Sequence, residues 1–431
     1  MILAHGIGGR QDLPIPFSLA LWGAAGVLIV TFGALAVLWK RPRLNRPDGG
    51  VALPAGLTGL ADAPATRAAL RVLGILLTGY VVVAAVAGPD DALNPTAGVV
   101  YVLFWVGLVP LSLLFGPVWR LLNPLRSIHW LLARAAGRDP AVGPRVLPPR
   151  LGYWPAAIGL LAFAWLELVA PDRASTSTLK LFFAVYAVAM LVGASLYGST
   201  WFDRCDAFEV WSSLIARMSP LGRRTTDRSL VLRSPLVGMA TTPVLPGLAA
   251  VVVVSLGSTA FDGFSRTDTW LRVIQAPGRS TTLFGTLGLL GALLVVAVTY
   301  VAATAPVGRD APNRFAPSML PIAVGYVVAH YFSLFVFEGQ HTLQLLSDPT
   351  GDGADLLGTG GGTVNYTLIS VSTIAGIRAG AVLVGHVLAV VLAHDRALED
   401  APAGGAALGV QLPLLTTMVG YTLAALLVLL R

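Results

Sequence analysis

Two histidines occupy the middle of two long apolar stretches near the C-terminus. His330 lies within PIAVGYVVAHYFSLFVFEGQH (321–341), and His386 lies within IRAGAVLVGHVLAVVLAHDRAL (377–398). Each stretch is long enough to span a bilayer. An ionisable side chain at that depth is costly, so it usually faces the protein interior and marks a functional path or site. The two stretches therefore predict a membrane protein with an internal polar site.

Further imidazole and carboxylate groups follow these two histidines. Glu338 and His341 come eight and eleven residues after His330, which places them along one stripe of the same helix. If the two stretches are neighbouring spans, His330 and His386 are level near the midplane and could meet. A Glu-x-x-His pair with a histidine from another helix is a set that binds transition metals in helical bundles. The candidate metal ligands are His330, Glu338, His341 and His386, with His394 and Asp395 as outer candidates.

Several interpretations of these residues remain open. Imidazole and carboxylate suit a divalent transition metal such as Zn, Fe or Cu, and the facing pair His330 and His386 could instead bind haem. The same groups could relay a proton or an ion, or simply hydrogen-bond neighbouring helices. His394 with Asp395 also fits an interfacial anchor, and Glu338 with His341 fits a solvated helix end where Gly339 stops the helix. His5, in the N-terminal arm, could fold back as an extra ligand.

Composition predicts the elements that must position these residues. The 431-residue chain is 55% hydrophobic and only 12% charged, and its mean hydropathy is +0.75. A soluble protein carries about twice that charged fraction. We therefore expect an all-α, polytopic transmembrane bundle forming a single domain over residues 1–431, with lipid as its main partner. About ten spans of roughly 20 residues follow, at approximately 17–39, 70–88, 95–116, 153–170, 179–198, 243–264, 282–305, 318–339, 377–397 and 411–430.

Loop charges predict the orientation of the chain in the plasma membrane. The loops after the first, third and fifth spans hold most of the arginines, whereas 89–94 and 342–376 contain acids and no bases. Because basic loops remain on the cytoplasmic side, both termini are predicted outside. The loop 265–281 is the weak point, since it is nominally external and carries three arginines.

A recurring sequence motif predicts structural corners, which are sharp turns between the end of a span and a short interfacial helix. GSTWFDRCDAFEVW (198–211) and GSTAFDGFSRTDTW (257–270) share their spacing of Gly-Ser-Thr, Phe-Asp and Trp, and GPVWRLLNPLRSIHW (116–130) is a looser relative. Glycine ends a span, a polar residue caps the next helix, and an amphipathic helix with Trp lies at the headgroups. A structural corner and an inverted transport repeat both fit this pattern.

The external loop 342–376 is predicted to act as a lid. Asp348, Thr350 and Asp352 resemble the start of a calcium loop, but Thr359 stands where that loop needs glutamate. The chain also lacks Gly-x-Ser-x-Gly, His-Glu-x-x-His and Cys-x-x-Cys patterns. A serine or cysteine nucleophile has no support, the single Cys205 excludes an internal disulfide, and no nucleic-acid-binding motif accompanies the net charge of +7.

Four segments carry a resemblance to a known group of proteins: LAHGIGGRQDLPIPF (3–17), WFDRCDAFEVWSSLIARMSPLGR (201–223), VAHYFSLFVFEGQ (328–340) and GHVLAVVLAHDRAL (385–398). Together with most of the chain, they resemble actinobacterial multi-pass membrane proteins labelled fenitrothion hydrolase. The resemblance implies hydrolysis of an apolar organophosphate triester, a small lipid-soluble molecule that could enter sideways from the bilayer. A metal-bound water with a pKa near 7 would then be the nucleophile.

The leading hypothesis is an integral membrane protein with a buried His/Glu site, acting as a metal-dependent hydrolase of apolar, phosphotriester-like substrates. The first alternative is a secondary transporter that uses the same groups as a proton or ion relay. The second is a haem-binding membrane redox subunit.

Overall fold

The protein is 71% helical and has very little β-structure. The computed structural model describes the chain from Leu13 to Leu429 except Pro14 and residues 401–405, so His5 lies outside the described residues. Within these described residues, ten helical segments are long and apolar enough to cross a membrane, which confirms the predicted all-α polytopic bundle. They are α1 (Phe17–Leu38), α3 (Pro64–Ala87), the segment 96–115, α8 (Trp154–Leu168) with the turn before it, α9 (Thr176–Tyr197), α13 (Leu248–Ser265), α15 (Thr281–Thr304), α16 (Ala311–Leu345), α17 (Val371–Asp400) and α18 (Ala406–Leu429).

Shorter elements connect these spans. The helices are α2 (Ala55–Asp62), α6 (Trp119–Leu122), α7 (Pro124–Ala135), α10 (Thr200–Cys205), α11 (Ala207–Ile215), α12 (Pro235–Ala240) and α14 (Asp268–Ile274). The third span is composite, with α4 (Thr96–Gly98), a π-helical stretch η2 (Val99–Val106) and α5 (Leu108–Phe115). A small antiparallel sheet, unexpected from the sequence, has the order β1-β3-β2, with β1 at Val51–Ala52, β2 at Leu221–Arg223 and β3 at Leu230–Leu232.

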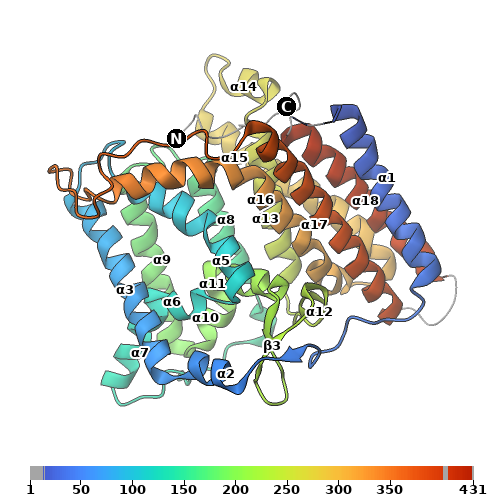
Figure 1. Cartoon of the computed structure of the whole chain (residues 1–431), viewed down its shortest axis with the longest axis horizontal. Coiled ribbons are helices and arrows are strands. Elements are labelled where there is room, and N and C mark those ends of the chain that lie inside the picture. The colour runs from blue at the N-terminus through green and yellow to red at the C-terminus, as the bar shows by residue number, and fades with distance from the viewer. Residues whose placement is uncertain (1–12, 14, 401–405, 430–431) are drawn as a thin grey trace. The chain divides into compact units, whose positions relative to one another are not determined.

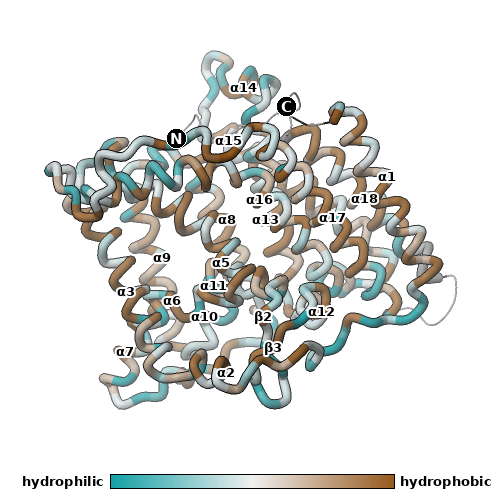
Figure 2. Tube along the Cα trace, viewed as in Figure 1, coloured by the Kyte–Doolittle hydropathy of each residue, from teal (hydrophilic) through white to brown (hydrophobic). Residues whose placement is uncertain are grey.

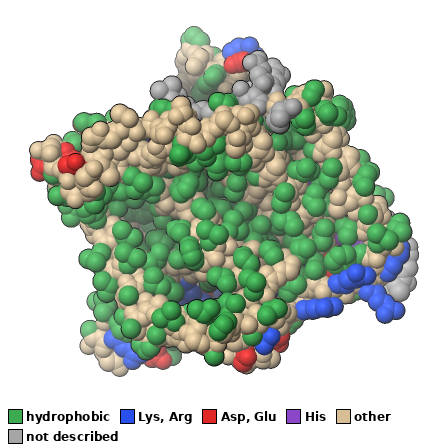
Figure 3. Space-filling model, in the orientation of Figure 1, with side chains coloured by type: hydrophobic (Ala, Val, Ile, Leu, Met, Phe, Trp, Pro, Cys, Tyr) green, Lys and Arg blue, Asp and Glu red, His purple; other side chains and the backbone are tan. Residues whose placement is uncertain are grey.

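The helices form two compact units (Figure 1). The first unit comprises residues 1–49, 234–333 and 366–431, and the second comprises residues 50–233 and 334–365. The boundary therefore falls inside α16, after Ser333. Long spans such as α3 and α18 are mainly apolar along their length (Figure 2), and hydrophobic side chains cover most of the visible surface (Figure 3). Apolar outer surfaces of this kind indicate lipid contact.

Close helix contacts build the first unit. Gly325 of α16 faces α17: a Cβ at this position would lie 2.5 Å from the carbonyl oxygen of Ala381 and 3.3 Å from the Cα of Gly385. Small residues allow such backbone approach in membrane bundles. Tyr326 and Ala329 then pack with Val382 in a buried cluster. The sequence thus fixes how α16 and α17 align.

An aromatic layer organises the second unit. Phe163 of α8 lies in ring contact with Tyr101 and Trp105 of the composite span and with Phe208 of α11. Phe163, Tyr101 and Phe208 are almost completely buried. Edge-on and tilted aromatic pairs stabilise beyond the area that they bury. This layer holds α11 against the spans and fixes the polar residues at its start.

Candidate functional site

A buried acid–imidazole pair lies in the first unit. Nε2 of His330 on α16 is 2.7 Å from Oδ2 of Asp262 on α13, and the Tyr331 hydroxyl donates to the same oxygen over 2.9 Å. Arg266, one turn after Asp262, donates to Oδ1 over 3.0 Å. The side chains of His330 and Asp262 are only 6% and 3% exposed. Two spanning helices are therefore joined by groups that can exchange a proton.

Aromatic rings fix the orientation of His330. Tyr326 is stacked with the imidazole at a centroid distance of 6.2 Å, and Tyr331 meets it edge-on at 4.7 Å. Tyr326 and His330 are four residues apart and so share one face of α16. This packing keeps Nε2 aimed at Asp262. The expectation that His330 is buried and partnered is met by an aspartate that the sequence prediction did not select.

His386 has a different hydrogen-bond partner from His330 and lies at a different height along the helix axes. Its Nδ1 lies 2.8 Å from the carbonyl oxygen of Val382, and its buried Nε2 has no hydrogen-bond partner in the described part of the chain. In the antiparallel contact of Gly325 with Gly385, His330 lies five residues beyond one glycine and His386 one residue beyond the other. At 1.5 Å per residue the two positions are about 9 Å apart along the axes. The register therefore corrects the expectation that the two histidines are level.

His394 and Asp395 attach α17 to the chain that follows α1. The ring nitrogens of His394 lie 2.8 Å from Oε1 of Gln411 and 3.0 Å from the carbonyl oxygen of Trp39. Asp395 accepts hydrogen bonds from the Trp39 indole and from the backbone N–H groups of Arg43 and Leu44, over 2.9, 2.7 and 3.1 Å. These contacts favour the anchor interpretation, because they already engage both ring nitrogens and both carboxylate oxygens.

Glu338 and His341 belong to the second unit. Glu338 is buried and His341 is half-buried, on a helix that continues through Gly339 to Leu345 instead of stopping at the glycine. Gly339 lies 3.8 Å from Leu103 of the composite span, measured from an ideal Cβ. Among the residues that the structure describes, no three His, Cys, Asp or Glu side chains gather as a group that could hold a metal ion. Metal ligation by the six candidate residues remains a prediction.

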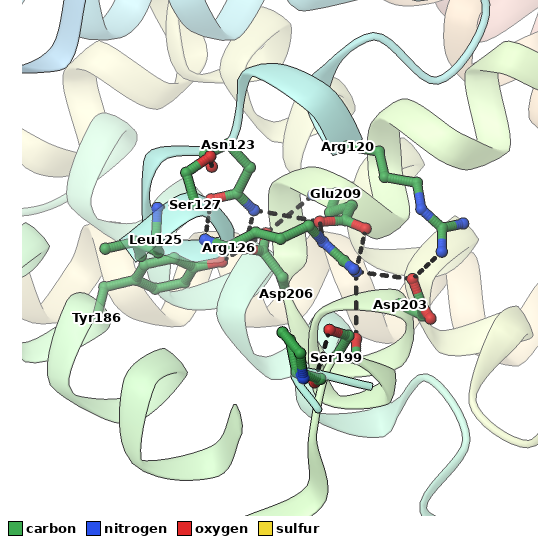
Figure 4. Close-up of polar contacts among 11 residues, drawn as sticks. Arg120, Asn123, Leu125, Arg126, Ser127, Tyr186, Ser199, Asp203, Asp206 and Glu209 are labelled. Carbon is green, nitrogen blue, oxygen red and sulfur yellow. Dashed lines mark hydrogen bonds and ion pairs between the residues drawn. The ribbon is translucent and has the colours of Figure 1, made fainter. Parts of the chain in front are cut away.

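A second polar centre, which the sequence prediction missed, lies in the second unit (Figure 4). Arg126 of α7 donates to both carboxylate oxygens of Glu209, over 2.9 and 2.6 Å, and to Asp203 over 2.7 Å. The Asn123 amide donates to Asp206 over 3.0 Å and to Glu209 over 3.2 Å. Asp206 and Glu209 are each 1% exposed. Two buried carboxylates thus lie close to one largely buried guanidinium, which bonds to Glu209 but not to Asp206.

The electrostatics of this centre follow from its burial. Burial raises the pKa of Glu209 to about 7, an effect that Arg126 opposes and the Asp206 charge reinforces. Burial also raises the pKa of Asp206, against the hydrogen bonds that it accepts from Glu209 N–H and Asn123. Arg126 has a raised pKa, because its carboxylate partners outweigh its own burial. The centre can therefore hold a proton close to neutral pH.

The repeated sequence motif, in its copies at 116–130 and 198–211, explains how this polar centre forms. Gly116 and Gly198 both adopt positive φ where α5 and α9 end. Asn123 then caps α7, accepting from Leu125 and Arg126 N–H, and Asp206 caps α11, accepting from Glu209 N–H. The two caps and their third helical residues, Arg126 and Glu209, bond to each other. This is the predicted structural corner, although its paired charges were not foreseen.

The copy of this sequence motif at 257–270 does not form a turn between two helices at its glycine. Gly257 to Asp262 lie inside α13, which continues to Ser265, and only Thr267 caps a new helix, α14. The shared letters therefore predicted a turn where the chain stays helical. The useful signal in this copy was Asp262, an acid inside an apolar span.

The loop 342–376 contains turns held by its own carboxylates. Asp348 accepts hydrogen bonds from the backbone N–H groups of Gly351, Asp352 and Gly353, and Asp355 accepts from Gly360 N–H and the Ser347 hydroxyl. Both carboxyls have lowered pKa values. For Asp348 these bonds outweigh burial, whereas for Asp355 the Ser347 bond is the largest cause. Asp348, the first residue of the calcium-loop pattern, is therefore already engaged by backbone N–H groups of the turn.

The fold and its buried polar centres define a polytopic α-helical membrane protein. Comparison with known proteins adds no closer class: no family model, no curated protein and no solved structure matches this chain.

Proposed function

We propose that this protein is a proton-coupled secondary transporter whose proton-binding site is the Asp262–His330 pair. The observation that supports the proposal is the 2.7 Å contact between a buried carboxylate and a buried imidazole on two different spanning helices. Imidazole changes its charge within the physiological pH range. Ionisable groups in such positions serve as proton relays in pumps and transporters.

Protonation changes what holds α13 and α16 together. With a proton on both ring nitrogens, His330 forms a charged pair with Asp262. When the proton leaves, the Asp262 carboxylate keeps the Tyr331 hydroxyl and Arg266 as donors. The attraction between the two helices is weaker in the second state, because one charge of the pair is gone. A transporter needs such a difference to couple proton binding to a change of helix packing.

Proton flux into liposomes tests the proposal. The purified protein is reconstituted in vesicles containing a pH-sensitive dye, and a potassium diffusion potential drives protons inward. We expect flux above that of empty vesicles for the native protein, and background flux for Asp262→Asn and His330→Gln. Asp268→Asn removes an exposed carboxylate of α14 and should behave as the native protein. Native-level flux in Asp262→Asn would contradict the proposal.

The second candidate is the metal-dependent hydrolase that the resemblance implies. One observation favours it: Nε2 of His386 is buried and has no hydrogen-bond partner among the described residues. A bound metal would supply a Lewis acid for an apolar substrate. However, the described residues do not assemble a ligand set around His386, so we derive no chemical step from a metal. Stoichiometric metal in the purified protein, lost in His386→Ala together with phosphotriester hydrolysis, would favour this candidate, and an optical spectrum would reveal haem.

A further inference from the structure

An unpaired cationic surface lies beside α7 in the second unit. The Trp130 ring is flanked by two guanidinium groups, with the Cζ of Arg71 4.5 Å and the Cζ of Arg134 5.9 Å from its centroid. Arg71 comes from α3 and Arg134 from the last turn of α7. We call these three residues the Trp130 clamp.

The backbone fixes the geometry of the Trp130 clamp. Gly74, three residues after Arg71, lets α3 touch the end of α6, since a Cβ there would lie 2.0 Å from the carbonyl oxygen of Leu122. Asn123 then starts α7 by capping it. The Gly74–Leu122 contact and the Asn123 cap together fix α3 against the start of α7. Arg71 and Trp130 are therefore held side by side on two helices and not on a flexible loop.

The nearby acids are already engaged by other arginines. Asp62 pairs with Arg67 and Arg223, and Asp203 pairs with Arg120 and Arg126. Within the described residues, neither Arg71 nor Arg134 has an ion pair or a hydrogen bond from its guanidinium. Ten donor N–H groups in two planar forks therefore have no protein acceptor.

The surroundings of the Trp130 clamp are those of a membrane interface. Leu131 and Leu132 follow Trp130 directly and are 51% and 60% exposed, as expected for side chains that enter the acyl region. A Trp in an amphipathic helix between two spans is typical of the headgroup level. Lys and Arg side chains are visible in the same part of the second unit (Figure 3).

From this arrangement we infer that the Trp130 clamp binds the phosphate of an anionic phospholipid headgroup. Arginine forks match phosphate oxygens bidentately. The loop 117–152 is predicted to be cytoplasmic, where the leaflet is rich in anionic lipid that basic residues attract. The exposed leucines supply the contact with the acyl chains. A phospholipid supplies both the phosphate and the acyl chains, whereas a free phosphate ion supplies only the phosphate.

Native mass spectrometry of the full-length protein in mixed micelles tests this inference. The protein is equilibrated with phosphatidylglycerol and phosphatidylcholine, and the ratio of the two lipids retained is measured. Each of Arg71→Gln and Arg134→Gln should lower the phosphatidylglycerol preference about fivefold, and Trp130→Leu should also lower it. The matched control is Arg145→Gln with Arg150→Gln, two exposed arginines of the same basic loop, which should leave the preference unchanged.

Two outcomes would overturn the inference. One is an unchanged lipid ratio in Arg134→Gln, an exposed position whose substitution leaves the fold intact. The other is an equal loss in the control pair, which would show that net charge alone attracts the lipid. Added inorganic phosphate at millimolar concentration should not displace phosphatidylglycerol. Displacement would assign the clamp to free anions instead.

Discussion

Arg126 neutralises only one of the two buried carboxylates that it helps to enclose. Arg126 donates twice to Glu209 and once to Asp203, while Asp206 relies on Asn123, the Tyr186 hydroxyl and the N–H of its own helix. An isolated buried charge is far costlier than a buried neutral acid. Burial raises the pKa of Glu209 to about 7 even beside an arginine, and the charge of the neighbouring Asp206 adds to the rise.

We expect the stability of the native protein to fall as pH rises through the pKa of Glu209. The folded-state pKa of about 7 lies above the ordinary glutamate pKa of 4.5. A raised folded pKa gives stabilisation that is complete below the unfolded value and is lost as the folded value is passed. Thermal unfolding between about pH 5 and pH 8 should therefore show a decreasing midpoint, and Glu209→Gln should flatten that slope.

Asp203→Asn provides the matched control for Glu209. Asp203 bonds to the same arginine, but its side chain is one-third exposed, so solvent screens its charge. This substitution should leave the pH slope close to native. An unchanged slope in Glu209→Gln would show that another group carries the proton.

At the scale of helices, the contact between α16 and α17 determines which of their side chains lie at the same height along the helix axes. Gly325 and Gly385 bring α16 and α17 together, and this register separates His330 from His386. Gly325→Ala places a Cβ 2.5 Å from the carbonyl oxygen of Ala381, so the helices must move apart. We expect a loss of about 1–3 kcal/mol, as for overpacking in a core, measured by denaturant unfolding in detergent.

Gly376→Ala is the matched control on the same helix pair. A Cβ at Gly376 meets nothing within 4 Å, and alanine favours a helix by up to about 1 kcal/mol over glycine. This substitution should be neutral or stabilising. Equal losses in both variants would mean that the close approach at Gly325 is not what orders α16 and α17.

The sequence predicted the membrane spans far better than it predicted which side chains contact one another. Ten apolar stretches could be found because the bilayer sets a length that each helix must satisfy alone. The partner of His330 could not be found in this way, because Asp262 lies 68 residues away and meets it only through packing. The small sheet likewise depends on neighbours distant in sequence, since β1 pairs with β3. Local patterns predicted a polar helix cap after the glycine of the motif, but they did not single out Asn123 or Asp206 or predict their pairing.

At the scale of the whole molecule, orientation remains a prediction from arginine asymmetry. Cysteines introduced by Arg46→Cys and Asp352→Cys should react with an impermeant maleimide from opposite sides of the membrane. Both positions are exposed, and the native Cys205 is buried, so the unsubstituted protein serves as the unlabelled control. Labelling from the same side would invalidate either the orientation or the span count.

Asp395 also imposes an order of events during synthesis. It accepts a hydrogen bond from the backbone of Arg43, a residue that leaves the ribosome 352 residues earlier. At 5–20 residues per second, that interval is roughly 20–70 s. All 184 residues of the continuous part of the second unit, 50–233, emerge within it. The helix α1 must therefore wait in the membrane without its final neighbours, and a ribosome that stalls before residue 395 leaves the first unit open while most of the second is already complete.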